Sequence, residues 1–176
     1  NPVWGTVTSG IINIYQYYRN DIVTLGVNNS GSAVITSSSI TPTSTSSVFY
    51  VDGCVTGGSG NDGTSSILQF SSNDGSSYSD GIRGGSWGST YGGHGGSFIM
   101  NDQDNGQNSI TKGYFAPSTT NAIKIKLSVT GHSGASIYIN HNSSGNNTTS
   151  QTTGVCTLRI YEVDGGAGNG NVSKTG

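Results

Sequence analysis

The chain has 176 residues with only seven Lys and Arg and nine Asp and Glu, so its formal net charge is −2. The basic residues are scattered along the sequence, and no run of eighteen apolar residues occurs. This pattern argues against a nucleic-acid partner and against membrane insertion, and no motif calls for a cofactor.

The composition favours β-structure. Gly, Ser, Thr and Asn together make up 95 residues, and Ile and Val total 27 against four Leu. β-Branched side chains suit a pleated sheet, whereas the best helix formers are scarce. We therefore expect an all-β protein built as an antiparallel two-sheet β-sandwich of the jelly-roll kind.

The N-terminal part contains three strand-like segments, at residues 11–18, 21–27 and 33–40. Residues 41–47 include Pro42 and read as a linker, so we expect an N-terminal β segment over residues 1–42 that packs separately. A β-sandwich domain then covers residues 43–164, and residues 165–176 form a flexible Gly/Asn tail.

Within the sandwich domain, strands are predicted at residues 48–55, 67–71 and 97–100. Asp-Gly pairs, which tight hairpin turns favour, begin at Asp52, Asp62, Asp74, Asp80 and Asp164. Residues 123–129 alternate strictly. The side chains expected inside are Ile123, Ile125, Leu127 and Val129, and those expected in solvent are Lys124, Lys126 and Ser128. Lysines on that outer face would also deter edge pairing. Residues 135–140 and 155–163 continue as successive antiparallel strands.

Two cysteines, Cys54 and Cys156, lie in strand-like segments about a hundred residues apart. A disulfide between them would close a long loop and add roughly 4 to 5 kcal/mol of stability. Alternatively, both are buried thiols that act as small apolar residues.

The most unusual stretch is residues 81–97, in which glycines surround Arg83, Trp87, Tyr91 and His94. Glycine lets backbone approach a partner closely, and the Trp and Tyr rings offer flat faces on which a sugar can stack. These four residues are the predicted ligand-binding set. The alternative is that Trp87 plugs one end of the sandwich as a packing residue.

No metal site is expected. Asp102 and Asp104 lie in a polar run that resembles a calcium loop, but the glycine is one place early and the final Glu is absent. A polar turn explains this run better. Glu162 is the sole glutamate and no nucleophile-elbow motif occurs, so we expect no enzyme activity.

Residues 67–78 (ILQFSSNDGSSY) resemble the strand followed by a serine-rich Asp-Gly hairpin that is common in tail-fibre and appendage proteins of tailed bacteriophages, cyanophages included. Residues 153–163 (TGVCTLRIYEV) resemble the closing strand of those domains. The resemblance implies a virion surface protein, extracellular and homotrimeric, that contacts other virion proteins and binds host cell-surface glycan. A cellular carbohydrate-binding module or adhesin, or a purely structural capsid or filament subunit, remains the alternative.

Overall fold

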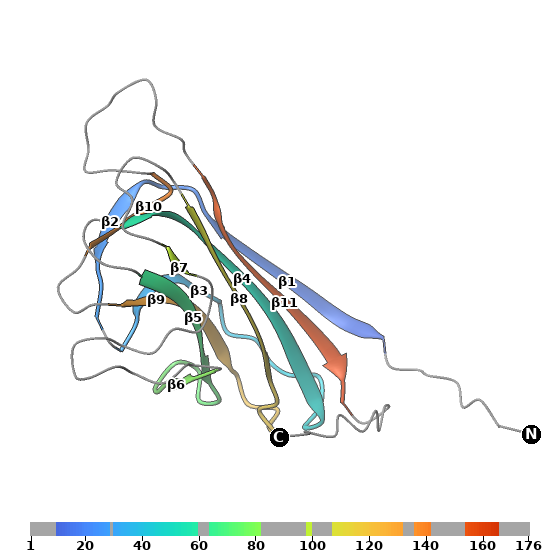
Figure 1. The fold of residues 1–176 in the computed structure, drawn as a ribbon. Coiled ribbons are helices and arrows are strands. Elements are labelled where there is room, and N and C mark those ends of the chain that lie inside the picture. The colour runs from blue at the N-terminus through green and yellow to red at the C-terminus, as the bar shows by residue number, and fades with distance from the viewer. Residues whose placement is uncertain are drawn as a thin grey trace, which may run out of the picture.

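The computed structural model describes residues 10–28, 30–59, 64–81, 98–99, 107–131, 136–141 and 154–165. These ranges form eleven β-strands arranged as two layered antiparallel sheets, which confirms the predicted all-β sandwich (Figure 1). Within these ranges, no helix is long and apolar enough to cross a membrane.

Sheet A contains six strands and sheet B contains five. Sheet A runs in the order β1 (Ile11–Arg19), β11 (Cys156–Asp164), β4 (Ser47–Ser59), β10 (Ser136–Ile139) and β2 (Val23–Gly26), and β8 (Gln107–Phe115) also pairs with β4. Sheet B runs β3 (Ser32–Thr36), β9 (Lys124–Gly131), β5 (Thr64–Ser71) and β6 (Ser79–Asp80), and β7 (Phe98–Ile99) also pairs with β5.

The long strand β4 organises sheet A. Its residues 49–54 pair with both β8 and β11, so these two strands flank it on opposite edges. Its last residues, from Gly57 to Ser59, pair with β10, which follows β11 along the same edge. One broad surface of β8, β4, β11 and β1 results, seen as the long band in Figure 1.

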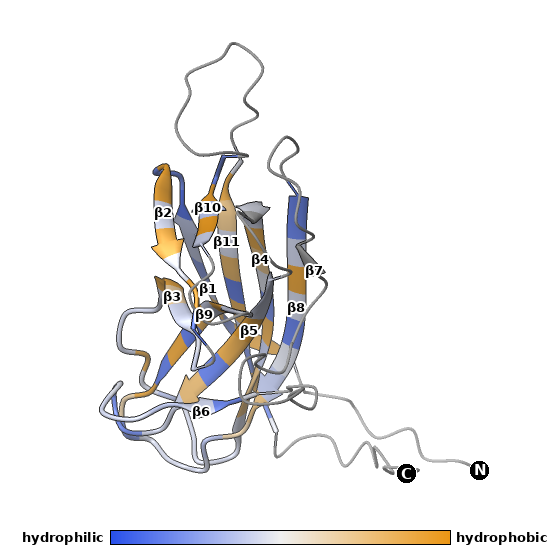
Figure 2. Cartoon of the chain, turned by 60° about the vertical axis from the view of Figure 1, so that its left-hand side comes forward, coloured by the Kyte–Doolittle hydropathy of each residue, from blue (hydrophilic) through white to orange (hydrophobic). Residues whose placement is uncertain are grey.

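The core lies between the two sheets and follows the alternation of the strands. Ile125, Leu127 and Val129 of β9 are fully buried, as predicted, and face Leu158 and Ile160 of β11 in one apolar cluster. Figure 2 shows the corresponding alternation of hydrophobic and hydrophilic residues along the strands. Burying each such side chain contributes about 1.5–3 kcal/mol, which is the main stabilisation of the sandwich.

Strand β9 differs from the expectation in two respects. It lies in the middle of sheet B, between β3 and β5, so Lys124 and Lys126 protect no sheet edge and β9 does not pair with β10. Ser128 is buried instead of exposed, and its hydroxyl donates a hydrogen bond of 2.9 Å to the Gln69 side-chain oxygen.

Two Asp-Gly pairs behave differently. Asp74 and Gly75 have φ of 53° and 87°, which is the positive-φ turn that the dipeptide predicts. Gly53 instead lies inside β4, within the strand predicted at residues 48–55. A Cβ on Gly53 would lie 2.7 Å from Leu127 Cδ1, and the glycine therefore lets the two sheets approach closely at this point.

The N-terminal segment, residues 1–42, contributes strands to both sheets where it is described. β1 and β2 belong to sheet A and β3 belongs to sheet B. Val34, Ile35 and Ile40 lie in the same apolar cluster as the rest of the core. The described part of this segment therefore packs within the sandwich, and Pro42 is buried beside the connection to β4.

Candidate functional site

The residues that the sequence singled out for ligand binding, Arg83, Trp87, Tyr91 and His94, lie outside the described residues. The same holds for the weak metal candidates Asp102 and Asp104. These assignments stay predictions.

The described residues bring together a different set of chemically active side chains, on the outer face of sheet A. We use this name for the solvent side of β8, β4, β11 and β1. Successive residues of a strand point to opposite sides of the sheet. In the middle of β4, Tyr50, Asp52 and Cys54 point outward, because the residues that alternate with them, Val51, Gly53 and Val55, are buried.

Three tyrosines form a row across this face. Tyr50 in β4 is the register partner of Tyr114 in β8 and of Tyr161 in β11. Tyr50 is 54% exposed and Tyr114 is 64% exposed, and Tyr161 is half-buried. Adjacent strands lie about 4.8 Å apart, so the row extends over about 10 Å, the scale of a disaccharide.

A charged row lies next to the tyrosines. Asp52 is the register partner of Lys112 on one side and of Arg159 on the other. Lys112 Nζ lies 3.6 Å from Asp52 Oδ1, an ion pair between two well-exposed side chains. The Arg159 side chain makes no hydrogen bond or ion pair with any residue in the described part of the chain. The row therefore carries one positive charge in excess.

A hollow of about 300 Å³ opens on the charged row. Its lining residues are Asp52, Gly53, Cys54, Ile110, Lys112, Thr157 and Arg159. The short side chains of Cys54 and Thr157 face each other across β4 and β11, whereas longer side chains from the flanking strands surround them. The hollow forms because short side chains at its centre are surrounded by longer ones.

Strand β1 extends the face beyond β11. Ile14 pairs with Tyr161, Gln16 with Arg159 and Tyr18 with Thr157. Ile14 is 61% exposed and Tyr18 is 69% exposed, so the apolar surface continues to the edge strand of the sheet. Exposed aromatic and apolar side chains gathered on one face of a folded domain are typical of an interaction site.

The reverse side of β11 is held by Glu162, which is fully buried. Its carboxylate accepts hydrogen bonds from Asn13 Nδ2 at 2.8 Å, the Thr43 backbone N–H at 2.6 Å and the Ser47 hydroxyl at 2.7 Å. Burial acts to raise the pKa of Glu162, but these donors outweigh burial and hold the pKa below its usual value. The network connects β1, β11 and the residues before β4, and so fixes the strands that carry Tyr161 and Arg159.

The two cysteines are free thiols. Cys54 pairs in register with Thr157, so Cys156 is its diagonal neighbour on the adjacent strand, but Cys54 points outward and Cys156 points into the core. The opposite orientation explains why the disulfide considered from the sequence is not formed.

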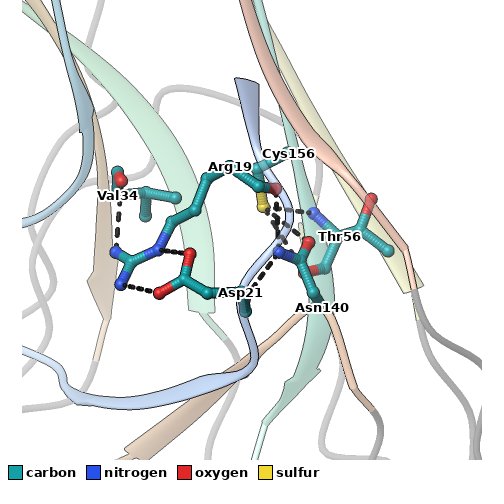
Figure 3. A network of polar contacts seen from close by, with 6 residues as sticks. All are labelled: Arg19, Asp21, Val34, Thr56, Asn140 and Cys156. Atoms are coloured by element: carbon teal, nitrogen blue, oxygen red, sulfur yellow. Dashed lines mark hydrogen bonds and ion pairs between the residues drawn. The ribbon is translucent and has the colours of Figure 1, made fainter. Parts of the chain in front are cut away.

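Cys156 lies in a polar network at the end of the core (Figure 3). Its thiol donates to Asn140 Oδ1 at 3.2 Å, and Asn140 Nδ2 donates to the backbone oxygens of Arg19 and Asp21 at 2.8 and 2.9 Å. Burial raises the pKa of the Cys156 thiol to about 11, so it is a packing residue and a poor nucleophile. Arg19 and Asp21 form a two-bond ion pair at 2.7 and 2.9 Å that closes the β1–β2 turn.

Within the described ranges, no group of three or more His, Cys, Asp or Glu side chains is placed to hold an ion. His141 is buried, with its ring centroid 5.2 Å from that of Tyr138.

The sequence reasoning missed strand β8, which supplies one third of the tyrosine row. In β8 the polarity is inverted, because Ser109 and Thr111 face the core while Ile110 and Tyr114 face solvent. The Ser109 hydroxyl is accommodated by Ser66, whose backbone N–H donates to it at 2.7 Å. Exposed apolar residues opposite small buried hydroxyls are the signal that could have indicated the face.

The sequence matches no family model and no curated protein. Among solved structures, the chain is similar to a chain in the structure of infectious bursal disease virus, Gx strain, with 9% sequence identity and a TM-score of 0.34. The match covers 87% of this chain and 42% of that chain, so the present chain spans less than half the length of the viral one.

Proposed function

We propose that the chain is a non-enzymatic surface protein of a virus particle, a bacteriophage tail fibre, spike or capsid appendage, that serves host attachment by binding cell-surface glycan. The viral assignment derives from the resemblance of residues 67–78 and 153–163 to tailed-phage appendage domains. The glycan-binding surface in this proposal is the outer face of sheet A. The observation that carries it is the exposed row of Tyr114, Tyr50 and Tyr161.

The chemistry of the row suits a sugar. A tyrosine ring offers an apolar face to the C–H side of a pyranose, and its hydroxyl hydrogen-bonds to sugar hydroxyls. The row lies on strands, which hold the rings more rigidly than a loop does, so little entropy is lost on binding. The neighbouring Asp52, Lys112 and Gln16 supply the polar groups that orient a sugar.

The arrangement supports binding better than hydrolysis. Glycoside hydrolysis uses two carboxyl groups facing one cleft. The Glu162 carboxylate is buried on the inner side of β11, where Asn13, Thr43 and Ser47 hydrogen-bond to it. Asp52 is the carboxylate that borders the hollow, and it is paired with Lys112.

The test is a glycan array and a cell pull-down with Tyr50→Ala and Tyr114→Ala. Both side chains are more than half exposed, so the melting temperature is expected to stay within about 2 °C of the parent while affinity falls at least five-fold. Ile22→Ala is the control, because Ile22 is equally exposed at 57% but lies in the β1–β2 turn. Parental binding by both tyrosine variants would refute the assignment of this face.

The proposal includes a homotrimer, in which part of the exposed apolar surface of each subunit packs against another subunit. Light scattering at micromolar concentration is expected to give three times the chain mass of 18.0 kDa. A stable monomer with intact glycan binding would favour the cellular carbohydrate-binding module instead. A trimer that binds no glycan and no cells would favour a purely structural subunit.

A further inference from the structure

We propose that the ligand of the outer face of sheet A is an acidic glycan, and that Arg159 binds its carboxylate in the hollow beside the tyrosine row. This inference rests on the proposed glycan-binding function and specifies the class of glycan. The charged residues of the face indicate the class of glycan, whereas the tyrosines alone do not distinguish a neutral glycan from an acidic one.

The hollow carries an unbalanced positive charge. Lys112 and Asp52 neutralise each other across β8 and β4 at 3.6 Å. Arg159 borders the same hollow and is exposed, and its guanidinium has no hydrogen-bond or ion-pair partner among the residues that the structure describes. Two cations and one anion leave a single positive charge beside a surface that is otherwise neutral.

The cation that carries this charge, the guanidinium of Arg159, has a geometry suited to a carboxylate. The guanidinium of arginine presents its donors in a planar fork that matches the two oxygens of a carboxylate, whereas lysine acts as a point charge. Arg159 is one register step from Tyr161 on the same side of β11, because Ile160 between them points into the core. A sugar ring stacked on the tyrosine row would therefore place a ring carboxylate next to Arg159, as a uronic or sialic acid does.

The hollow has room for the carboxylate of a sugar. Its volume of about 300 Å³ is at the lower end for small-ligand sites. The floor is formed by Cys54 and Thr157, which leave the space above them open. The thiol of Cys54 thus lies where a bound carboxylated sugar would cover it, and it serves as a reporter of occupancy.

The experiment compares polygalacturonate with its methyl ester, which removes the charge and keeps the sugar, and dextran sulfate with dextran. Polygalacturonate is expected to bind at least ten-fold more tightly than its ester, with an affinity that falls as salt rises. It is also expected to slow the reaction of Cys54 with iodoacetamide. Dextran sulfate that binds as strongly as polygalacturonate would show that any anion suffices and would overturn the carboxylate assignment.

Variants separate a local contact from a general charge effect. Arg159→Gln is expected to lower affinity for polygalacturonate about ten-fold and to leave affinity for the ester unchanged. Arg159→Lys retains the charge without the fork and should recover only part of the loss. Lys124→Gln removes the same charge from sheet B and should have no effect, because Lys124 pairs with Asp74 far from this face.

The two proposals fail differently. Equal binding of polygalacturonate and its ester, unaffected by Arg159→Gln, would overturn the acidic-glycan inference while the glycan-binding function stands. Absence of binding to all four polymers and to cells would overturn both. Equal losses for Arg159→Gln and Lys124→Gln would show that net charge, not Arg159, governs binding.

Discussion

Replacing Glu162 with Gln tests whether the buried carboxylate network fixes the strands that carry the site. The carboxylate accepts three hydrogen bonds of 2.6–2.8 Å from Thr43, Ser47 and Asn13. A glutamine has one acceptor oxygen and presents an NH₂ group to donors on the other side, so it loses one or two of these bonds. At about 1.5–3 kcal/mol for a hydrogen bond to a charged group, the expected loss is about 1.5–6 kcal/mol.

Thermal and urea unfolding at pH 7 measure this loss. For a chain of this length the decrease in melting temperature should be roughly 3–24 °C. Asp52→Asn is the matched control, since Asp52 is half-exposed and its ion pair with Lys112 contributes little to folding stability.

The pH dependence supplies a second, independent readout. The pKa of Glu162 is lower in the folded protein than in the unfolded chain. Its contribution is therefore fully present above the unfolded value and is lost as pH falls through the folded pKa. The parent and Glu162→Gln should converge in stability at low pH. A constant difference from pH 7 to pH 3, or no difference at pH 7, would refute the reasoning.

Two further predictions concern the thiols and the contact between sheets. Native protein should react with a thiol reagent at Cys54 alone, because burial raises the pKa of Cys156 to about 11. After unfolding, both cysteines should react. Equal labelling of both thiols in the native state would contradict the assigned orientations. Gly53→Ala should destabilise the fold by about 1–3 kcal/mol, because its Cβ would lie 2.7 Å from the buried Leu127 Cδ1. Gly26→Ala, whose Cβ would meet nothing within 4 Å, should be neutral in the same urea titration, and equal stability of the two variants would exclude the close contact.

The strands could be predicted where apolar and polar residues alternate and the apolar residues are the buried ones. The pattern from Ile123 to Val129 predicted a strand and its buried face, and Ile137, Ile139, Leu158 and Ile160 followed the same rule. The pairing was not predictable, because alternation determines which face a residue occupies but not which sheet the strand joins. For this reason β9 and β10 were expected together and lie in different sheets.

The candidate site was harder to predict, since it depends on register between strands distant in sequence. Tyr50, Tyr114 and Tyr161 become one row only when β4 pairs with both β8 and β11. The inverted polarity of β8 also conceals the strand, because Ile110 and Tyr114 would be assigned to the core by composition alone. Aromatic residues in the glycine-rich segment attracted the sequence prediction, whereas tyrosines in ordinary strands were not distinguishable from core residues.

Hydroxyl-radical footprinting with and without polygalacturonate, read by mass spectrometry, tests the central claim most directly, because it maps the binding surface on the unmodified protein. The account predicts reduced oxidation of Tyr50, Tyr114 and Cys54 on binding, with Tyr78, which lies beside Lys126 of sheet B, unchanged. Protection of Trp87 and Tyr91 with no change at Tyr50 and Tyr114 would contradict it and would assign binding to the glycine-rich segment.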